Sequence, residues 1–390
     1  MSARQTFLPY CRPSIGDEEV AAVTRALLNG WLTTGPQAAA FEQAFAHACG
    51  VPHAVALNSC TAGLHLALAA FEIGAGDEVV MPSLTFAAGA QCAIELGARP
   101  VLCDVEPDTF AVSLRTIAPR VTTRTKAVIT MPYAGRPIGM DEIVDFARER
   151  SIAVIEDAAH GAGTLDRGQW PGALSDAAVY SFYATKNLTT GEGGMLVTHD
   201  ASLAERVRLL SLHGMSRDAW RRYSNGGSWR YDVLEPGYKY NMPDVLASIG
   251  LVQLQRMPSL QRRRAELADR YYAGLAELPG LRCQPPCRHP GDRHSWCMLA
   301  LIVDEAVAGV GRDELIERLR RRNIGTSVHY IPTHAFSAYR HLPAAPLPNT
   351  EAIARQILSL PLYPEMADSD VNDVLEALRG ALQTKPILIA

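Results

Sequence analysis

The sequence predicts an α/β protein in which a mostly parallel mixed sheet lies between helices, followed by a smaller α+β domain. Two features support this fold class. Short apolar runs alternate with amphipathic helical patterns from residue 54 to residue 198, which is the order of βαβ units. These runs are apolar throughout, as expected for parallel strands covered on both faces. Because the pattern changes near Pro243, we expect a large domain at residues 1–242 and a smaller one at residues 243–390.

The composition is that of an ordinary globular chain with small-molecule ligands. Of its 390 residues, 48% are hydrophobic and 20% are charged, which excludes the disordered and fibrous classes. The formal net charge of −4 favours neither nucleic acid nor an acidic membrane as partner. The sequence has no apolar run of about 18 residues and no apolar signal-peptide core, so we expect a cytoplasmic protein. Its eight cysteines are scattered, and we expect reduced thiols and no metal site.

The predicted elements begin with a helix over 15–29, which has acidic residues in its first turn and ends at Gly30. The loop WLTTGP at 31–36 carries an aromatic residue that either packs locally or inserts into a neighbouring molecule. Further helices are expected at 41–48, 64–73, 85–96, 141–150 and 204–212, and after Ser113. Strands are expected at 54–57, 78–81, 99–105, 127–131, 153–155, 177–181 and 195–198.

The remaining elements belong mainly to the smaller domain. The polar stretch 213–241 is long for a loop in a compact chain, so we expect it to be functional or mobile. A long helix from 244 to 270 or beyond, broken near Pro258, follows it. Strands near 298–303 and 325–330 are then expected to alternate with helices at 312–322 and 351–358.

A turn of small and hydroxyl residues, including Ser59 and Thr61, follows the first predicted strand and precedes a helix. Such a turn directs backbone N–H groups and hydroxyls at one point before the helix N-terminus, which suits a phosphate. It contains neither GxGxxG nor a Walker lysine, so it is no dinucleotide or NTP fingerprint. A plain N-capped helix is an equally good interpretation of this segment alone.

Lys186 lies in SFYATKN, just past the strand predicted at 177–181 and before a glycine-rich turn. A lysine at such a place is expected to be partly desolvated and therefore nucleophilic, although most lysines are solvated surface residues. Asp157 similarly ends the strand predicted at 153–155. A carboxylate there could keep a pyridine nitrogen protonated, which pyridoxal phosphate (PLP) requires to act as an electron sink. Ligands of parallel sheets bind beyond the carboxyl ends of the strands, so one pocket could collect both side chains.

Nearby residues complete a possible PLP site. Lys186 would supply the Schiff base, Ser181 and the turn at 59–61 would bind the phosphate, and Phe86 or His160 would stack on the ring. Each assignment is weak alone, but their joint occurrence at strand ends is much less expected by chance. His160 has a plainer alternative as a hydrogen-bonded core histidine.

These residues make the chain resemble, over essentially its whole length, the DegT/StrS family of sugar-nucleotide aminotransferases, which are PLP enzymes of fold type I. Within that family the resemblance is to C4-aminating members. The matching stretches include GWLTTGP, SCTAGLHLAL, GDEVVMPSLTF, IEDAAHGAGT, SFYATKNLTTGEGGM, PGYKYNMPD and GTSVHYIPTH.

The resemblance implies roles for individual residues. Lys186 would bind PLP as a Schiff base and shuttle the proton, Asp157 would pair with the ring nitrogen, and His160 would sit beside the ring. The other cofactor contacts implied in this way are Thr61, Ala62, Phe86, Ser181 and Asn241.

The resemblance also implies a homodimer with shared active sites, in which Asn241 reaches the phosphate of the partner's PLP. His329 and Tyr330 would border the sugar. Trp31 and Thr33, in the loop expected to complete the partner's pocket, would be further substrate contacts.

The function implied is transfer of an amino group from L-glutamate to a keto carbon, C4 in the first instance, of a nucleotide-linked sugar. Alternatives are a C3 ketosugar or a keto-cyclitol as acceptor. A PLP-dependent sugar dehydratase shares the fold but resembles cases in which histidine replaces the lysine, so Lys186 argues against it. A non-catalytic regulatory homologue would need a decayed constellation, and this one is intact.

Overall fold

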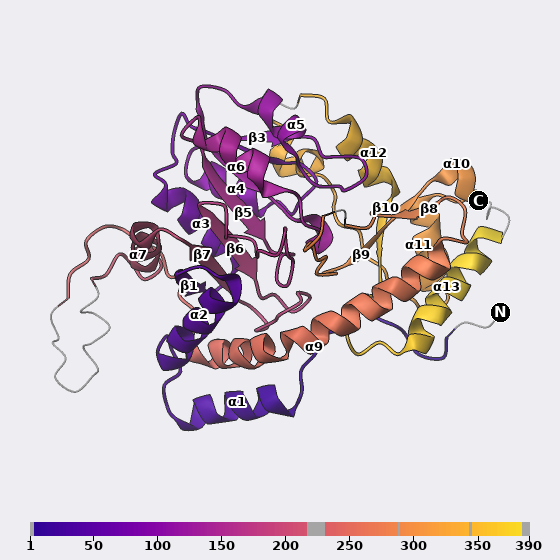
Figure 1. The fold of residues 1–390 in the computed structure, drawn as a ribbon, viewed down its shortest axis with the longest axis horizontal. Helices are drawn as coiled ribbons and strands as arrows, with labels where there is room; N and C mark the ends of the chain where they lie inside the picture. The colour runs from indigo at the N-terminus through magenta and orange to yellow at the C-terminus, as the bar shows by residue number, and fades with distance from the viewer. Residues whose placement is uncertain (1–3, 217–230, 288, 343–344, 384–390) are drawn as a thin grey trace.

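The computed structural model describes residues 4–216, 231–287, 289–342 and 345–383 (Figure 1). It contains a seven-stranded sheet of order β1-β7-β6-β5-β4-β2-β3 and a three-stranded sheet of order β10-β9-β8. The strands of the large sheet are β1 (His53–Leu57), β2 (Glu78–Pro82), β3 (Arg99–Cys103), β4 (Thr125–Thr130), β5 (Ala153–Ala158), β6 (Ala177–Ser181) and β7 (Gly194–Thr198). Only β7 runs antiparallel to its neighbours in this sheet, so the predicted α/β class with a mostly parallel mixed sheet is confirmed.

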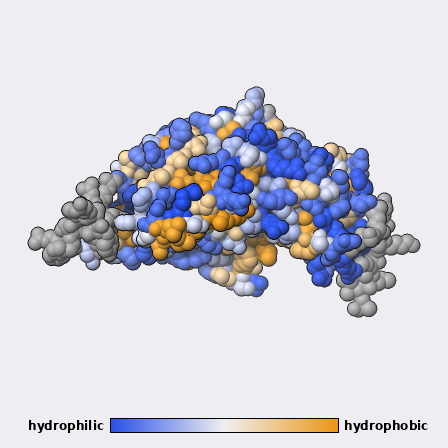
Figure 2. Space-filling view, turned by 90° about the horizontal axis from the view of Figure 1, so that it is seen from below, coloured by the Kyte–Doolittle hydropathy of each residue, from blue (hydrophilic) through white to orange (hydrophobic). Residues whose placement is uncertain are grey.

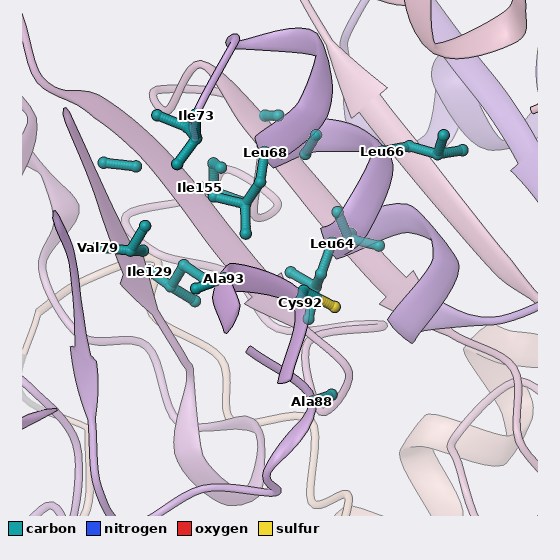
Figure 3. Packing of buried hydrophobic residues seen from close by; sticks show 14 of the residues in the cluster. Leu64, Leu66, Leu68, Ile73, Val79, Ala88, Cys92, Ala93, Ile129 and Ile155 are labelled. Carbon is teal, nitrogen blue, oxygen red and sulfur yellow. The ribbon is translucent and has the colours of Figure 1, made fainter. Parts of the chain in front are cut away.

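Helices cover both faces of the large sheet because successive strand residues point to opposite sides. On β6, Val179 lies in the core beneath α3, whereas Tyr180 lies in the core with Phe41 and Phe45 of α2. Figure 3 shows the first of these cores, where Leu64 of α3 and Cys92 of α4 lie over the sheet. The helices of this part of the chain are α1 (Asp17–Leu28), α2 (Pro36–Cys49), α3 (Cys60–Ala70), α4 (Ala88–Glu95), α5 (Leu114–Ile117), α6 (Met140–Arg148) and α7 (Ala201–Leu210). Of these, α1 packs on the long helix α9 (Asp244–Leu275) rather than on the sheet (Figure 1).

The smaller sheet and its helices form a separate core near the C-terminus, which also includes Leu8 from the N-terminal segment. The strands are β8 (Leu281–Cys283), β9 (Leu299–Val303) and β10 (Ile357–Leu360), and the helices are α10 (Glu305–Ala308), α11 (Arg312–Arg320), α12 (Pro348–Gln356) and α13 (Asp368–Gln383). The long helix α9 runs from the large sheet to this core (Figure 1). The domain boundary at 242/243 stays a prediction.

Three sequence-based expectations for this part of the chain are wrong. Helix α9 continues through Pro258. A proline removes one N–H donor and so disfavours a continuous helix, but Met257 and Leu260 are buried on either side of Pro258 and hold the helix in place. The expected strand at 325–330 forms only one isolated bridge, between Ser327 and Ser359. The helix expected at 351–358 ends at Gln356, and the next four residues pair with β9, because so short an apolar run does not distinguish helix from strand.

Residues 217–230 of the polar stretch at 213–241 lie outside the described residues. Among the described residues, no helix combines the length and apolar character needed to cross a bilayer.

Asp244 joins α9 to the loop before α2. Its buried carboxylate accepts hydrogen bonds from the backbone N–H groups of Gly35 at 2.7 Å, Gln37 at 3.0 Å and Ala38 at 3.0 Å. A carboxylate at a helix N-terminus satisfies donors that have no partner within the helix and opposes the helix dipole. The position of the 31–35 loop therefore depends on a residue more than two hundred positions away.

We predict that Asp244→Ala lowers the free energy of unfolding by roughly 2–4 kcal/mol, because it leaves three backbone donors unpaired, one of them buried and two part-buried. The matched control is Asp200→Ala, which removes the exposed cap of α7 that accepts from Ser202 and Leu203 and should cost about 1 kcal/mol or less. Urea denaturation followed by circular dichroism measures both. Equal losses for the two variants would contradict the structural importance given to Asp244.

Candidate active site

A cavity of about 450 Å³ lies beyond the carboxyl ends of β5 and β6. It is the place that parallel-sheet topology favours for a ligand. Of the residues predicted for the site, it brings together Thr61, Phe86, Asp157, Ser181, Lys186, His329 and Tyr330.

The other predicted site residues lie outside the cavity lining. His160 is buried behind Tyr330, and the Ala62 N–H donates to Ser59 Oγ at 3.0 Å. Trp31, Thr33 and Asn241 do not line the cavity of their own chain. Asn241 Nδ2 donates instead to Thr34 Oγ1 at 2.6 Å, so it contacts the 31–35 loop.

Asp157 is held at the end of β5 by hydrogen bonds to one of its two oxygens. Oδ1 accepts from the Ala159 N–H at 3.1 Å and from the Cys60 thiol at 3.6 Å. Burial raises the pKa of Asp157, while the Ala159 amide and the nearby charge of Lys186 act in the opposite direction. A cation bound at this carboxylate would offset the cost of burying its charge. Asp157 is therefore suited to hold a protonated ring nitrogen.

Lys186 lies in the turn after β6, where its backbone N–H donates to the Tyr183 carbonyl at 2.9 Å. The next residue, Asn187, is buried and fixes this turn. Its Nδ2 donates to the Ser295 carbonyl at 2.6 Å, the Ala162 carbonyl at 3.2 Å and Gln261 Oε1 at 3.4 Å. The Lys186 side chain consequently lines the cavity from a turn that three distant segments hold in place.

The turn before α3 is pressed against the start of β7. Ser59 is the N-cap of α3, and a Cβ atom on Gly194 would lie 2.5 Å from the Ser59 carbonyl carbon and oxygen. Only glycine fits so close an approach. Gly194 also pairs with Ser181 of β6, so the α3 N-terminus and Ser181 lie at one end of the cavity, where hydroxyls and N–H groups can bind an anion.

The aromatic residues of the cavity differ in exposure. Phe86 is 62% exposed and presents its ring to the cavity, as a stacking partner for a planar ligand would. His329 Nδ1 lies 2.8 Å from Ser359 Oγ. Burial, together with the charge of Lys186, lowers the pKa of His329 to about 4, so this imidazole is neutral at neutral pH.

The residues present fit PLP. An amine and a carboxylate lie at neighbouring strand ends, an aromatic ring is exposed to the same cavity, and hydroxyls surround a helix N-terminus. Sequence reasoning missed Cys60 and Asn187. Cys60 carries no distinguishing local pattern, whereas a polar residue next to the key lysine could have drawn attention to Asn187.

Comparisons with known proteins agree with this geometry. The model of the DegT/DnrJ/EryC1/StrS aminotransferase family matches residues 13–379. The chain is 48% identical over 384 residues to the spore coat polysaccharide biosynthesis protein SpsC of Bacillus subtilis (strain 168), covering 97% of this chain and 98% of SpsC.

Two solved structures extend the comparison. The PLP form of the putative sugar aminotransferase Spr1654 from Streptococcus pneumoniae has a TM-score of 0.87 and 30% identity, covering 97% of this chain and 99% of that one. DesI, solved in the presence of its TDP-sugar product, has a TM-score of 0.87 and 33% identity, covering 98% of this chain and 95% of DesI.

Proposed function

Since the chain belongs to the DegT/DnrJ/EryC1/StrS aminotransferase family and is a PLP-dependent sugar aminotransferase, we propose that it transfers the amino group of L-glutamate to C4 of a nucleotide-linked 4-ketosugar. The observation that carries the proposal is the meeting of Lys186 and Asp157 in one cavity with the hydroxyl-rich turn before α3. A nucleotide-linked acceptor is supported by DesI, which was solved with a TDP-sugar product.

In this proposal some residues bind the cofactor, and Lys186 also transfers a proton. Bound PLP supplies an electron sink when its ring nitrogen is protonated, and Asp157 keeps that nitrogen protonated. Thr61, Ser181 and the N-terminus of α3 bind the phosphate, while Phe86 covers one face of the ring. The Lys186 amine would hold the cofactor covalently and would be the group that moves the proton at the amine-bearing carbon. His329 and Tyr330 border the sugar.

We further propose a homodimer in which Asn241 and the loop with Trp31 and Thr33 complete the partner's site. A part-buried hydrogen bond from Asn241 to Thr34 joins these segments to each other, and none of Trp31, Thr33 and Asn241 lines the cavity of its own chain. Hydrophobic residues are exposed on α1 and in this loop, among them Val20, Leu28 and Leu32. Figure 2 shows hydrophobic patches on the face of the molecule where α1 lies. Such exposure is typical of interaction surfaces, and a twofold axis would create two equal composite sites.

The first prediction for this function concerns Lys186. With PLP, isotopically labelled L-glutamate and a panel of UDP- and dTDP-linked 4-ketosugars, the wild-type protein should give a labelled amino sugar that mass spectrometry detects. Lys186→Ala should abolish this product, because it removes both the covalent attachment and the proton carrier.

The matched control is Lys126→Ala, at an exposed position of β4, which should retain activity. A borohydride-trapped adduct on another lysine would contradict the assignment. Product from only 3-ketosugars or keto-cyclitols would refute the C4 proposal while leaving the enzyme class intact.

The second prediction concerns Asp157. Asp157→Asn should keep PLP bound but slow transamination by several orders of magnitude, because a neutral ring nitrogen makes a poor electron sink. Glu156→Gln is the matched control, since Glu156 is a buried carboxyl on the same strand whose hydrogen bonds go to Gly172 and Ser175. Single-turnover absorbance with glutamate measures the rate. A loss of less than about tenfold, or about 1.4 kcal/mol of barrier, would remove Asp157 from this role.

The third prediction concerns the shared site. Lys186→Ala and Asn241→Phe should each inactivate the homodimer, but mixing them under conditions of subunit exchange should restore activity, because a mixed dimer has one site with neither change. The measurement is turnover before and after exchange, with exchange followed by mass spectrometry of tagged subunits. If exchange occurs and activity stays absent, the sites are not shared.

A further inference from the structure

The hydrogen bond between His160 and Tyr330, next to the cavity, has a donor and an acceptor that its surroundings determine. His160 is 1% exposed, and both nitrogens of its ring have partners. Nδ1 accepts from the backbone N–H of Ala134 at 3.3 Å, and Nε2 lies 2.9 Å from the Tyr330 hydroxyl. The two rings are nearly parallel, with 2° between their planes.

The Ala134 amide determines which nitrogen of His160 carries the proton. A backbone N–H can only donate, so Nδ1 must offer its lone pair. Burial lowers the pKa of His160 well below its usual value, and the charge of Lys186 acts in the same direction, so the ring carries a single proton. That proton is consequently on Nε2, and the Nε2–H group donates to the Tyr330 oxygen.

The Tyr330 hydroxyl is therefore an acceptor on its His160 side. In the described part of the chain, His160 is its only hydrogen-bond partner, and Tyr330 lines the cavity with Lys186 and Asp157. Burial keeps the pKa of Tyr330 well above its usual value, so the phenol retains its proton. The ring is held between Phe86, at 6.4 Å between centroids, and Tyr133, at 6.5 Å.

Resting on the proposed function, we propose that Tyr330 is a catalytic residue that donates its hydroxyl proton in a hydrogen bond to an oxygen of the bound cofactor or substrate, and that His160 is a positioning residue acting through Tyr330. Two oxygens have the required acceptor chemistry, namely the phenolic oxygen of PLP and the carbonyl oxygen of the ketosugar. His160 contributes by occupying the other side of the Tyr330 oxygen, which leaves the hydroxyl hydrogen directed at the ligand. The family resemblance implies that His160 sits beside the PLP ring, whereas in this proposal His160 acts through Tyr330.

The test begins with Tyr330→Phe, which removes only the hydroxyl. The variant is loaded with PLP, and the visible absorption band and both half-reactions are measured, one with L-glutamate and one with a UDP- or dTDP-linked 4-ketosugar. Loss of a hydrogen bond to a charged or polarised oxygen should slow the affected step roughly 10- to 100-fold. A shifted band identifies the PLP oxygen as the acceptor. An unchanged band with a slowed ketosugar half-reaction alone identifies the sugar oxygen.

The control is Tyr272→Phe, which removes a hydroxyl that donates to the Gln284 carbonyl outside this cavity. It should leave the band and both half-reactions unchanged. If Tyr330→Phe also changes none of them by more than about twofold, the proposal is overturned. Turnover by the wild-type enzyme in the same assay tests the proposed function separately.

A double-mutant cycle tests the role of His160. His160→Leu removes the N–H donor, and His160→Gln keeps an amide donor that should recover part of the loss. In the Tyr330→Phe background, His160→Leu should cost nothing further, because the two residues act as one unit. An additional loss there equal to that in the wild-type background would show that His160 acts directly. Thermal unfolding of each variant without PLP separates misfolding from these effects.

Discussion

The geometry of the site depends on the hydrogen bonds that the buried side-chain amide of Asn187 donates. It binds the segment at Ala162, the middle of α9 at Gln261 and the segment at Ser295, and it directly follows the lysine proposed to carry the cofactor. A buried carbonyl group left without a donor costs about 1–3 kcal/mol. Movement of the turn would therefore destabilise these three segments, and their movement would destabilise the turn. The position of the Lys186 backbone is thus a property of the tertiary structure.

The register of the large sheet supplies the second constraint. Leu57 of β1 and Ser181 of β6 both pair with Gly194 of β7, which brings the ends of two strands distant in sequence to one point. The missing side chain of Gly194 then lets the turn at Ser59 approach that point. The hydroxyl-lined N-terminus of α3 and the amine of Lys186 can therefore bind the same ligand, if its length matches the separation between them.

The fold and the centre of the site could be predicted because their signals are local. Apolar runs identify buried strands, and Asp157 lies near the end of one strand and Lys186 in the turn after its neighbour, so topology alone places both at one sheet edge. The contact of His160 with Tyr330 joins residues 170 positions apart, and neither residue carries a local sign of it. The role of Asn241 was predicted only through the family resemblance, whereas the loop with Trp31 and Thr33 was also singled out by its exposed aromatic residue; within one chain Asn241 contacts this loop.

Burial in the cavity disfavours unpaired charges, and this limits which residues can carry a proton in the proposed reaction. Burial raises the pKa of Asp157 and lowers the pKa of both His160 and His329, the latter to about 4. Neutral histidines can orient hydroxyls but cannot supply a proton from a charged form near neutral pH. The buried carboxylate, by contrast, keeps its charge most readily against a cationic partner, which a protonated ring nitrogen provides. Neutral histidines therefore leave proton transfer to the Lys186 amine, as we propose, and their proposed role is to fix the direction of neighbouring hydrogen bonds.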